Sequence, residues 1–160
     1  MTEKMTPRIE TIGNIKLVGM FKKMTPARDT TKELFRGLMP RKKEINALNP
    51  KIYCLQLYDV IGFDDFNENT QFVKWGAVEV ADFSLIPEGM SSLVLEAGKY
   101  AVFIHHGRAS AFHKTWTLIF DSWLPSSGYS LDSRPHFQLL PPNYNPVDPN
   151  AEEEVWVPIK

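Results

Sequence analysis

The stretch GKYAVFIHHGRASAFHKTWTLIFDSWLPSSGYSLDSRP, residues 98–135, decides the fold because it holds a strand, a turn and a helix in succession. Its first part, 99–105, is an apolar run bounded by glycines, which predicts a buried strand. Further along, apolar side chains recur at the 3.6-residue period, which predicts a helix that stops at Pro125. Aromatic side chains on such a helix usually pack in the core, and we expect this of Trp116 and Trp123.

The composition fits a single globular domain over residues 1–160, with 43% hydrophobic and 23% charged residues. A net charge of −1 without a basic block argues against binding of nucleic acid. No apolar signal segment or membrane-spanning run occurs in the sequence, so we expect a cytoplasmic protein that does not bind membranes. The single cysteine, Cys54, has no partner for an internal disulfide and is expected to be a buried strand residue.

Strand and helix signals continue through the rest of the chain. Thr30-x-x-Glu33 is a capping-box pattern and predicts the start of a helix that ends or kinks at Pro40. A polar loop is expected over 59–70, and the acidic run 152–154 is expected to be a solvated strand entry. The predicted strands are 9–20, 52–58, 71–80 and 155–159, with an edge strand at 92–95 and a short strand from Phe137.

The two halves of the chain align with each other at an offset of 85 residues, which places Gly13 on Gly98 and Pro40 on Pro125. Each half then reads as one strand–helix–strand–strand unit, over about 9–80 and 98–160. Neither unit can bury its apolar surface alone, so the units should dock. We expect an α+β domain with pseudo-twofold symmetry, antiparallel strands, two main helices and a ligand cleft at the seam between the units.

No catalytic signature accompanies this pattern. Nucleophile-elbow, phosphate-loop and dinucleotide motifs are absent from the sequence, and the four histidines have no metal-ligand spacing. We therefore predict no catalytic residue, no metal and no cofactor. Aromatic residues are the stronger signal, because flat rings stack on planar or cationic ligands. The predicted cleft walls are Tyr53, Trp75, Phe103 and Trp156. Two carboxylates, Glu79 and Glu154, would select cations if they face the cleft, although strand alternation also allows them to face solvent.

Several runs resemble the AraC-type effector-binding domain, also called the gyrase-inhibitor-like small-molecule-binding family. They are FVKWGAVEV (72–80), AGKYAVF (97–103), WxxIFxxWLP (116–125) and RPxF (134–137). The resemblance implies two strand–helix–strand–strand units that bind hydrophobic or cationic small molecules in the cleft between them. Relatives occur behind DNA-binding domains of transcription activators or as single domains, and we expect this chain to be free-standing. Some relatives inhibit DNA gyrase and others hydrolyse reactive small molecules.

One position departs from the family pattern. The family commonly carries a glutamate directly after the aromatic residue of RPxF, where it pairs with cationic ligands, and this chain has Gln138. An amide forms hydrogen bonds but carries no net charge. We expect Gln138 to be the polar anchor for neutral or polar aromatic ligands, unless Glu79 or Glu154 replaces the missing charge.

Three function classes follow from these observations. The first is a small-molecule-binding module that senses or sequesters its ligand. The second is a hydrolase in which Tyr53, Glu79 or Glu154 activates water. The third is a protein-interaction role of the gyrase-inhibitor type, with a protein partner or a homodimer.

Overall fold

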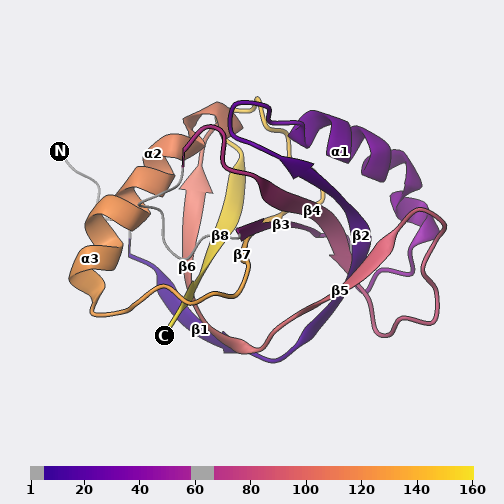
Figure 1. The fold of residues 1–160 in the computed structure, drawn as a ribbon, viewed down its shortest axis with the longest axis horizontal. Helices are drawn as coiled ribbons and strands as arrows, with labels where there is room; N and C mark the ends of the chain where they lie inside the picture. The colour runs from indigo at the N-terminus through magenta and orange to yellow at the C-terminus, as the bar shows by residue number, and fades with distance from the viewer. Residues whose placement is uncertain (1–5, 59–66) are drawn as a thin grey trace.

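The computed structural model describes residues 6–58 and 67–160 (Figure 1). Its strands are β1 (Arg8–Ile12), β2 (Ile15–Met24), β3 (Ile52–Tyr58), β4 (Phe72–Glu79), β5 (Ser91–Leu95), β6 (Gly98–His106), β7 (His136–Leu140) and β8 (Glu152–Ile159). They form one sheet in the order β1-β6-β8-β7-β3-β4-β2-β5, and every pair in it is antiparallel.

The helical segments fall into two groups. The first is α1 (Thr31–Leu38), which continues as the 3₁₀ helix η1 (Met39–Glu44). The second is a continuous run of η2 (Ala109–Ala111), α2 (Phe112–Thr117), the π-helix η3 (Leu118–Trp123) and α3 (Leu124–Ser127). The prediction of an antiparallel α+β fold with two main helical regions is therefore confirmed.

The sheet is built from two matched halves. One half runs β2, α1, β3, β4 and the other runs β6, the second helical region, β7, β8. Antiparallel pairing of β3 with β7 joins them at the centre of the sheet. The strand that precedes each half pairs with the other half. β1 precedes β2 but pairs with β6, and β5 precedes β6 but pairs with β2. The pseudo-twofold arrangement expected from the internal repeat is therefore present.

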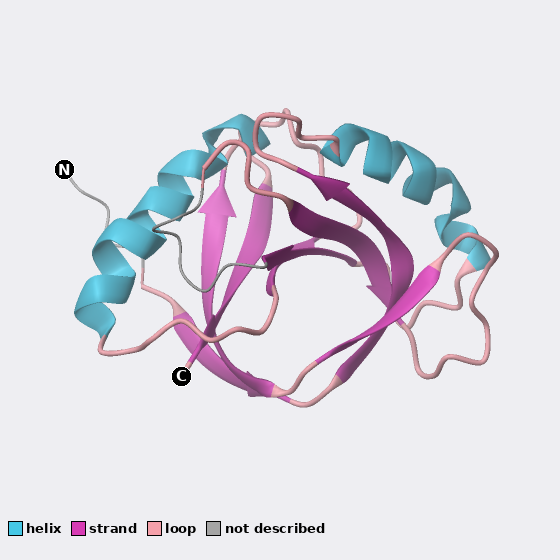
Figure 2. Cartoon of the chain, in the orientation of Figure 1, coloured by secondary structure: helices cyan, strands magenta, loops and turns pink. Residues whose placement is uncertain are grey.

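Both helical regions lie on the same face of the sheet, at either side of its centre (Figures 1 and 2). Under α1, Leu38 packs with Val18 of β2 and Val78 of β4. Under the second region, Ile119 packs with Phe103 and Val157. The two helical regions therefore cover opposite ends of the sheet, and the central strands β3 and β7 lie between them.

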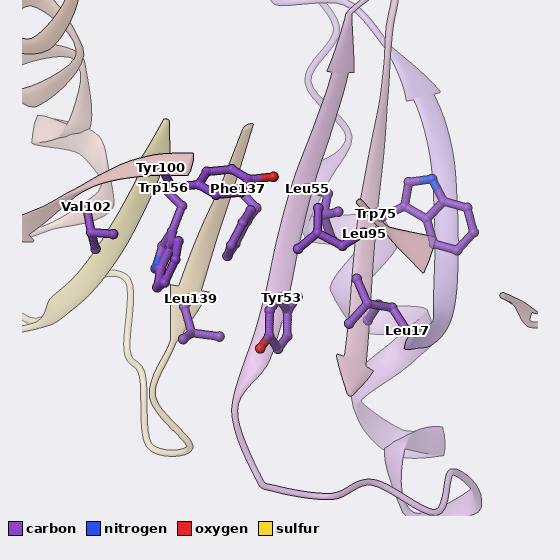
Figure 3. Packing of buried hydrophobic residues seen from close by; sticks show 11 residues of the cluster. Leu17, Tyr53, Leu55, Trp75, Leu95, Tyr100, Val102, Phe137, Leu139 and Trp156 are labelled. Atoms are coloured by element: carbon purple, nitrogen blue, oxygen red, sulfur yellow. The ribbon is translucent and has the colours of Figure 1, made fainter. Parts of the chain in front are cut away.

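The opposite face of the sheet carries a separate buried cluster that spans both halves (Figure 3). Its members are Leu17, Tyr53, Leu55, Trp75, Ala77, Leu95, Tyr100, Val102, Phe137, Leu139 and Trp156. We call this group the interior cluster, and the face that carries it the interior face. Since strand residues alternate between faces, neighbours of these positions point toward the helices.

Two boundary predictions were wrong. The segment 9–20 is two strands, because β1 pairs with β6 whereas β2 pairs with β4, so the chain turns at Gly13 and Asn14 between them. The helix also passes through Pro125, the second residue of α3, which follows directly on the π-helix η3. It ends instead at Gly128, whose φ of 81° is the left-handed conformation of a helix C-terminus.

Two local side-chain predictions also changed. Thr30 makes no side-chain cap at the start of α1, and Asp29 instead accepts hydrogen bonds from the backbone and hydroxyl of Thr31. In the acidic run 152–154, predicted to be solvated, Glu153 is only 4% exposed. Most of the loop predicted over 59–70 lies outside the described residues, and 67–70 form a turn.

Candidate functional site

The seven predicted ligand contacts fall on two faces of the sheet. Five of them lie on the interior face: Tyr53, Trp75, Glu79, Glu154 and Trp156. Phe103 and Gln138 lie on the face that carries the helices, because their strand neighbours Val102 and Phe137 belong to the interior cluster. The seven residues therefore do not line one common site.

The interior aromatic residues pack against one another. Phe137 stacks on Trp156 with ring centroids 5.1 Å apart and contacts Tyr53 at 5.5 Å. Tyr100 meets the rings of Phe137 and Trp156 edge-on. Trp75, on the other half of the sheet, contacts Phe21 at 4.9 Å. Tyr53, Trp75 and Trp156 are each less than a tenth exposed, so this group has the packing of a core, and its contact with a ligand stays a prediction.

The two interior carboxylates already have protein partners. Glu154 accepts hydrogen bonds from Arg8 Nη2 at 2.8 Å and from Trp156 Nε1 at 3.1 Å. Glu79 accepts from Asn49 Nδ2 at 3.2 Å and more weakly from the Tyr53 hydroxyl at 3.5 Å. Burial, with the nearby Glu79 charge, raises the pKa of Tyr53, so its phenol stays protonated at neutral pH.

Phe103 is a packing residue beneath the second helical region. Its ring meets Trp123 edge-on at 5.1 Å, and Trp123 in turn stacks on Tyr129 at 6.1 Å. Trp123 thus packs as the sequence predicts. Both tryptophans are partly buried, but only Trp123 packs against the core cluster beneath the helix, whereas the ring of Trp116 contacts Phe120 and His136.

Gln138 lies at the centre of a polar chain that runs across three strands. Gln56 Nε2 of β3 donates to Gln138 Oε1 of β7 at 3.1 Å, and Gln138 Nε2 donates to Glu153 Oε1 of β8 at 2.7 Å. Alternation places all three side chains on the helix face, since Leu55, Phe137 and Trp156 belong to the interior cluster. We call this row of side chains, together with Tyr58 and His136 at its end, the central seam.

Aromatic rings border one end of the central seam. His136 contacts Tyr58 edge-on at 5.7 Å and Phe120 at 5.8 Å, and Phe120 lies 4.3 Å from Trp116. Phe120 belongs to the π-helix η3, a type of turn that occurs frequently at functional sites. Tyr58, Trp116 and Phe120 are all partly exposed. The central seam therefore combines a hydrogen-bonded polar floor with accessible flat rings.

Burial shifts the titration of groups along the central seam. It lowers the pKa of His136 to about 4, so the ring is neutral at pH 7. Burial, with the charge and hydrogen bond of Glu153, raises the pKa of Tyr144, in the loop between β7 and β8. Burial also raises the pKa of the Cys54 thiol, which gives it the character of a buried strand residue rather than a reactive thiolate.

Three further observations concern the described part of the chain. A hollow of about 420 Å³ lies between β2 and α1, and its lining includes Met20, Glu33 and Gly89 but none of the seven predicted residues. Within residues 6–58 and 67–160, no three His, Cys, Asp or Glu side chains are grouped so as to hold a metal ion. The same residues contain no helix that is long and apolar enough to cross a membrane.

Sequence reasoning missed Gln56, Glu153 and Tyr144. The position of Glu153 could have been predicted from strand alternation. If Trp156 faces the interior, Val155 and Val157 face the helices, and so does Glu153, two residues before Val155. Its contact with Gln138 was not available, because the register of β7 against β8 comes from tertiary pairing.

Two docked strand–helix–strand–strand units, with a polar seam between their helical regions, make up this domain. The chain matches the GyrI-like small molecule binding domain over residues 5–160 and belongs to that family. The resemblance found in the sequence is therefore confirmed.

Curated relatives include regulators and inhibitors. The transcriptional regulator BrlR of Pseudomonas aeruginosa is 27% identical over 136 residues, which cover 82% of this chain and 47% of the regulator. A DNA gyrase inhibitor of Erwinia billingiae is 41% identical over 59 residues, covering 35% of this chain and 37% of the inhibitor. The matched segments thus span less than half of either relative.

Solved structures share the fold at low sequence identity. SAV2435 bound to tetraphenylphosphonium has a TM-score of 0.70 and 16% identity, with 98% of this chain and 94% of that chain covered. The EcmrR C-terminal domain has a TM-score of 0.71 and 16% identity, covering 98% of each chain. A hydrolase from Listeria innocua has a TM-score of 0.57 and 13% identity, covering 96% of this chain and 91% of the hydrolase.

Proposed function

We propose that this chain binds small molecules with apolar, aromatic groups at the central seam, as a ligand-sensing or ligand-sequestering domain. The observation that carries the proposal is the position of Trp116 and Phe120, both partly exposed, against His136 at the end of the part-buried polar chain of Gln138. Membership of a small-molecule-binding family supports it. The tetraphenylphosphonium bound by SAV2435 supports a ligand with several aromatic rings.

The central seam is a better candidate than the interior cluster for a physical reason. A ligand on the interior face would have to separate rings that already pack against one another, with centroids 5.1 to 5.5 Å apart. That would expose apolar surface whose burial stabilises both halves of the sheet. A ligand at the central seam can instead add its rings to side chains that are still partly exposed, such as Trp116.

Ligand binding is tested with methyltriphenylphosphonium, a probe with three phenyl rings. We expect it to quench tryptophan fluorescence and to raise the melting temperature of the protein, because a ligand that binds only the folded state stabilises it. Trp116→Leu should weaken binding about tenfold, since it removes an aromatic contact at the site.

The matched control is Phe21→Leu, which removes a half-exposed aromatic ring that contacts Trp75 on the interior face. This variant should bind the probe as the unmodified protein does. Weakened binding in Phe21→Leu with unchanged binding in Trp116→Leu would move the site to the interior face. The absence of both quenching and stabilisation in the unmodified protein would contradict the proposal.

A further inference from the structure

Strand β2 has a neighbour on its outer side over only half of its length. β4 pairs with residues 17–24 on the inner side, whereas β5 pairs with residues 15–19 on the outer side (Figure 1). β5 begins at Ser91 and does not follow β2 any further. Over residues 20–24, the outer edge of β2 therefore has no partner strand in the described part of the chain. We call this stretch the open edge.

The backbone of the open edge points hydrogen-bonding groups outward. The carbonyl of Lys16 accepts a hydrogen bond of 2.9 Å from the N–H of Val80, so the backbone groups of even-numbered β2 residues point toward β4. Since successive residues alternate, the N–H and C=O groups of Phe21 and Lys23 point away from β4. Among residues 6–58 and 67–160, no strand pairs with these two residues on that side. A strand edge of this kind can take an extended peptide as an additional strand.

The hollow between β2 and α1 lies directly beside the open edge. Its volume is about 420 Å³, and its lining includes Met20 and Lys22 of β2, Leu34 and Gly37 of α1, and Gly89 before β5. Met20 faces the helices, because it packs with the cluster beneath α1. Side chains of an added strand that point to the helix face would therefore enter the hollow.

Gly37 keeps this hollow open. It lies within α1, where glycine lowers helix stability relative to alanine. The packing of the helix does not require glycine, because a Cβ atom there would lie 3.7 Å from Met20 Sδ, an ordinary contact, and Gly37 has no positive φ. The lack of a side chain at Gly37 therefore weakens the helix and preserves space beside the strand edge.

The surroundings of the open edge are basic. Residues 20–43 contain eight lysines and arginines against two acidic residues, although the whole chain has a net charge of −1. Lys22 pairs with Glu33 at 2.6 Å. Lys23 is exposed and forms no ion pair with any residue that the structure describes. Such a surface attracts an acidic chain, and it repels the same basic edge of a second copy.

We infer that the open edge and the hollow beside it form a docking site for an extended acidic segment of a partner protein. The segment adds to the sheet as a strand antiparallel to β2, in line with β5, and hydrogen-bonds to the outward groups of Phe21 and Lys23. Its apolar side chains enter the hollow, and carboxylates at the alternate positions lie beside Lys23. Duplex DNA has the complementary charge, but it has no peptide backbone to pair with a strand and no apolar side chains to fill the hollow.

The probe is a fluorescein-labelled peptide of alternating glutamate and valine, whose two residue types fall on opposite faces of a strand. Fluorescence anisotropy should show saturable binding to the unmodified protein that weakens as salt is added. The same peptide with lysine in place of glutamate should bind at least about tenfold more weakly. N-methylation of the glutamates removes the N–H groups that face β2 and should abolish binding, whereas N-methylation of the valines removes those that face away and is the matched control.

Variants of the protein test the same site from the other side. Lys23→Pro removes the outward N–H but no hydrogen bond to β4, and it should weaken binding of the probe about tenfold or more. Lys23→Gln removes only the charge and should weaken binding about two- to fivefold at low salt. Gly37→Phe should fill the hollow and abolish binding, and the matched control Gly37→Ala should change binding by less than about twofold. If Lys23→Pro fails to fold, as circular dichroism would show, the N-methylated peptides still decide with the unmodified protein.

Several outcomes would overturn the inference. If the two N-methylated peptides bind alike, the segment does not add as a strand. If the unmodified protein sediments as a dimer that Lys23→Pro dissociates, the open edge pairs with a second copy instead. If the protein binds duplex DNA but not the peptide, and Lys23→Gln weakens the DNA binding, the basic surface serves nucleic acid. The central seam is a separate site, so each of these results leaves the proposed binding of methyltriphenylphosphonium untouched.

Discussion

His136 is a histidine whose ring is buried at the border of the central seam, in contact with Tyr58, Trp116 and Phe120. Burial lowers its pKa to about 4 in the folded protein, against 6.5 for the ordinary side chain. Between these values the unfolded chain binds a proton that the folded chain does not. Above pH 6.5 the His136 ring is neutral in both states, so it does not reduce the free energy of unfolding. That free energy then falls as the pH is lowered from 6.5 toward 4.

We predict that the free energy of unfolding falls as the pH is lowered from 7 to 4, with His136 contributing on the order of 3 kcal/mol to that fall. Urea unfolding at a series of pH values measures it. The variant His136→Gln, which does not titrate, should show a smaller fall over the same range. Equal pH dependence in the two proteins would mean that His136 does not titrate in this way.

At the scale of single elements, β2 approaches β4 too closely for a side chain at Gly19. A Cβ atom placed there would lie 2.0 Å from the carbonyl oxygen of Gly76 and 2.6 Å from the Cα of Ala77. Both of these are backbone atoms, which cannot move without disturbing the ladder between the strands. Glycine is thus required at Gly19 by the packing of the two strands, not by its backbone angles.

Gly19→Ala should therefore destabilise the protein by about 3 kcal/mol or more, the upper range for overpacked sites. Urea unfolding measures the change in the free energy of unfolding. The control is Gly13→Ala, because a Cβ there would meet nothing within 4 Å, and it should change stability by less than about 1 kcal/mol. Similar losses in both variants would show that the close approach of β2 and β4 is not the cause.

The two halves of the molecule share one core on the interior face. Phe137, 1% exposed, belongs to the second half, and its ring lies 5.5 Å from that of Tyr53 in the first half. The β3–β7 ladder joins the same two strands through backbone pairing. Neither half can therefore unfold without exposing rings of the other, and the chain should unfold as one unit.

We predict that Phe137→Ala lowers the free energy of unfolding by about 3 to 5 kcal/mol, the usual cost of removing a buried phenylalanine. Circular dichroism and tryptophan fluorescence should report the same urea midpoint for the unmodified protein. Val147→Ala, at a side chain that is 69% exposed, is the control and should leave the midpoint nearly unchanged. Separate midpoints for the two probes would show that the halves unfold independently.

Much of the fold was predictable because it depends on local signals. Apolar runs bounded by glycine and proline predicted β3, β4, β6 and β8 to within a few residues, and the alignment of the two halves predicted their matched topology. The exchange of β1 and β5 between the halves was not predictable, because partner choice at a sheet edge depends on contacts distant in sequence.

The site was predicted less well than the fold. The sequence by itself determined the two-unit α+β architecture and the family. Only the tertiary structure decided which residues share a face. It placed Tyr53, Trp75 and Trp156 in a packed cluster on one side and Gln138 beside Glu153 on the other. The reason is that the sequence pattern shows which residues of one strand share a face. The register that brings residues of different strands together is set only in the assembled sheet.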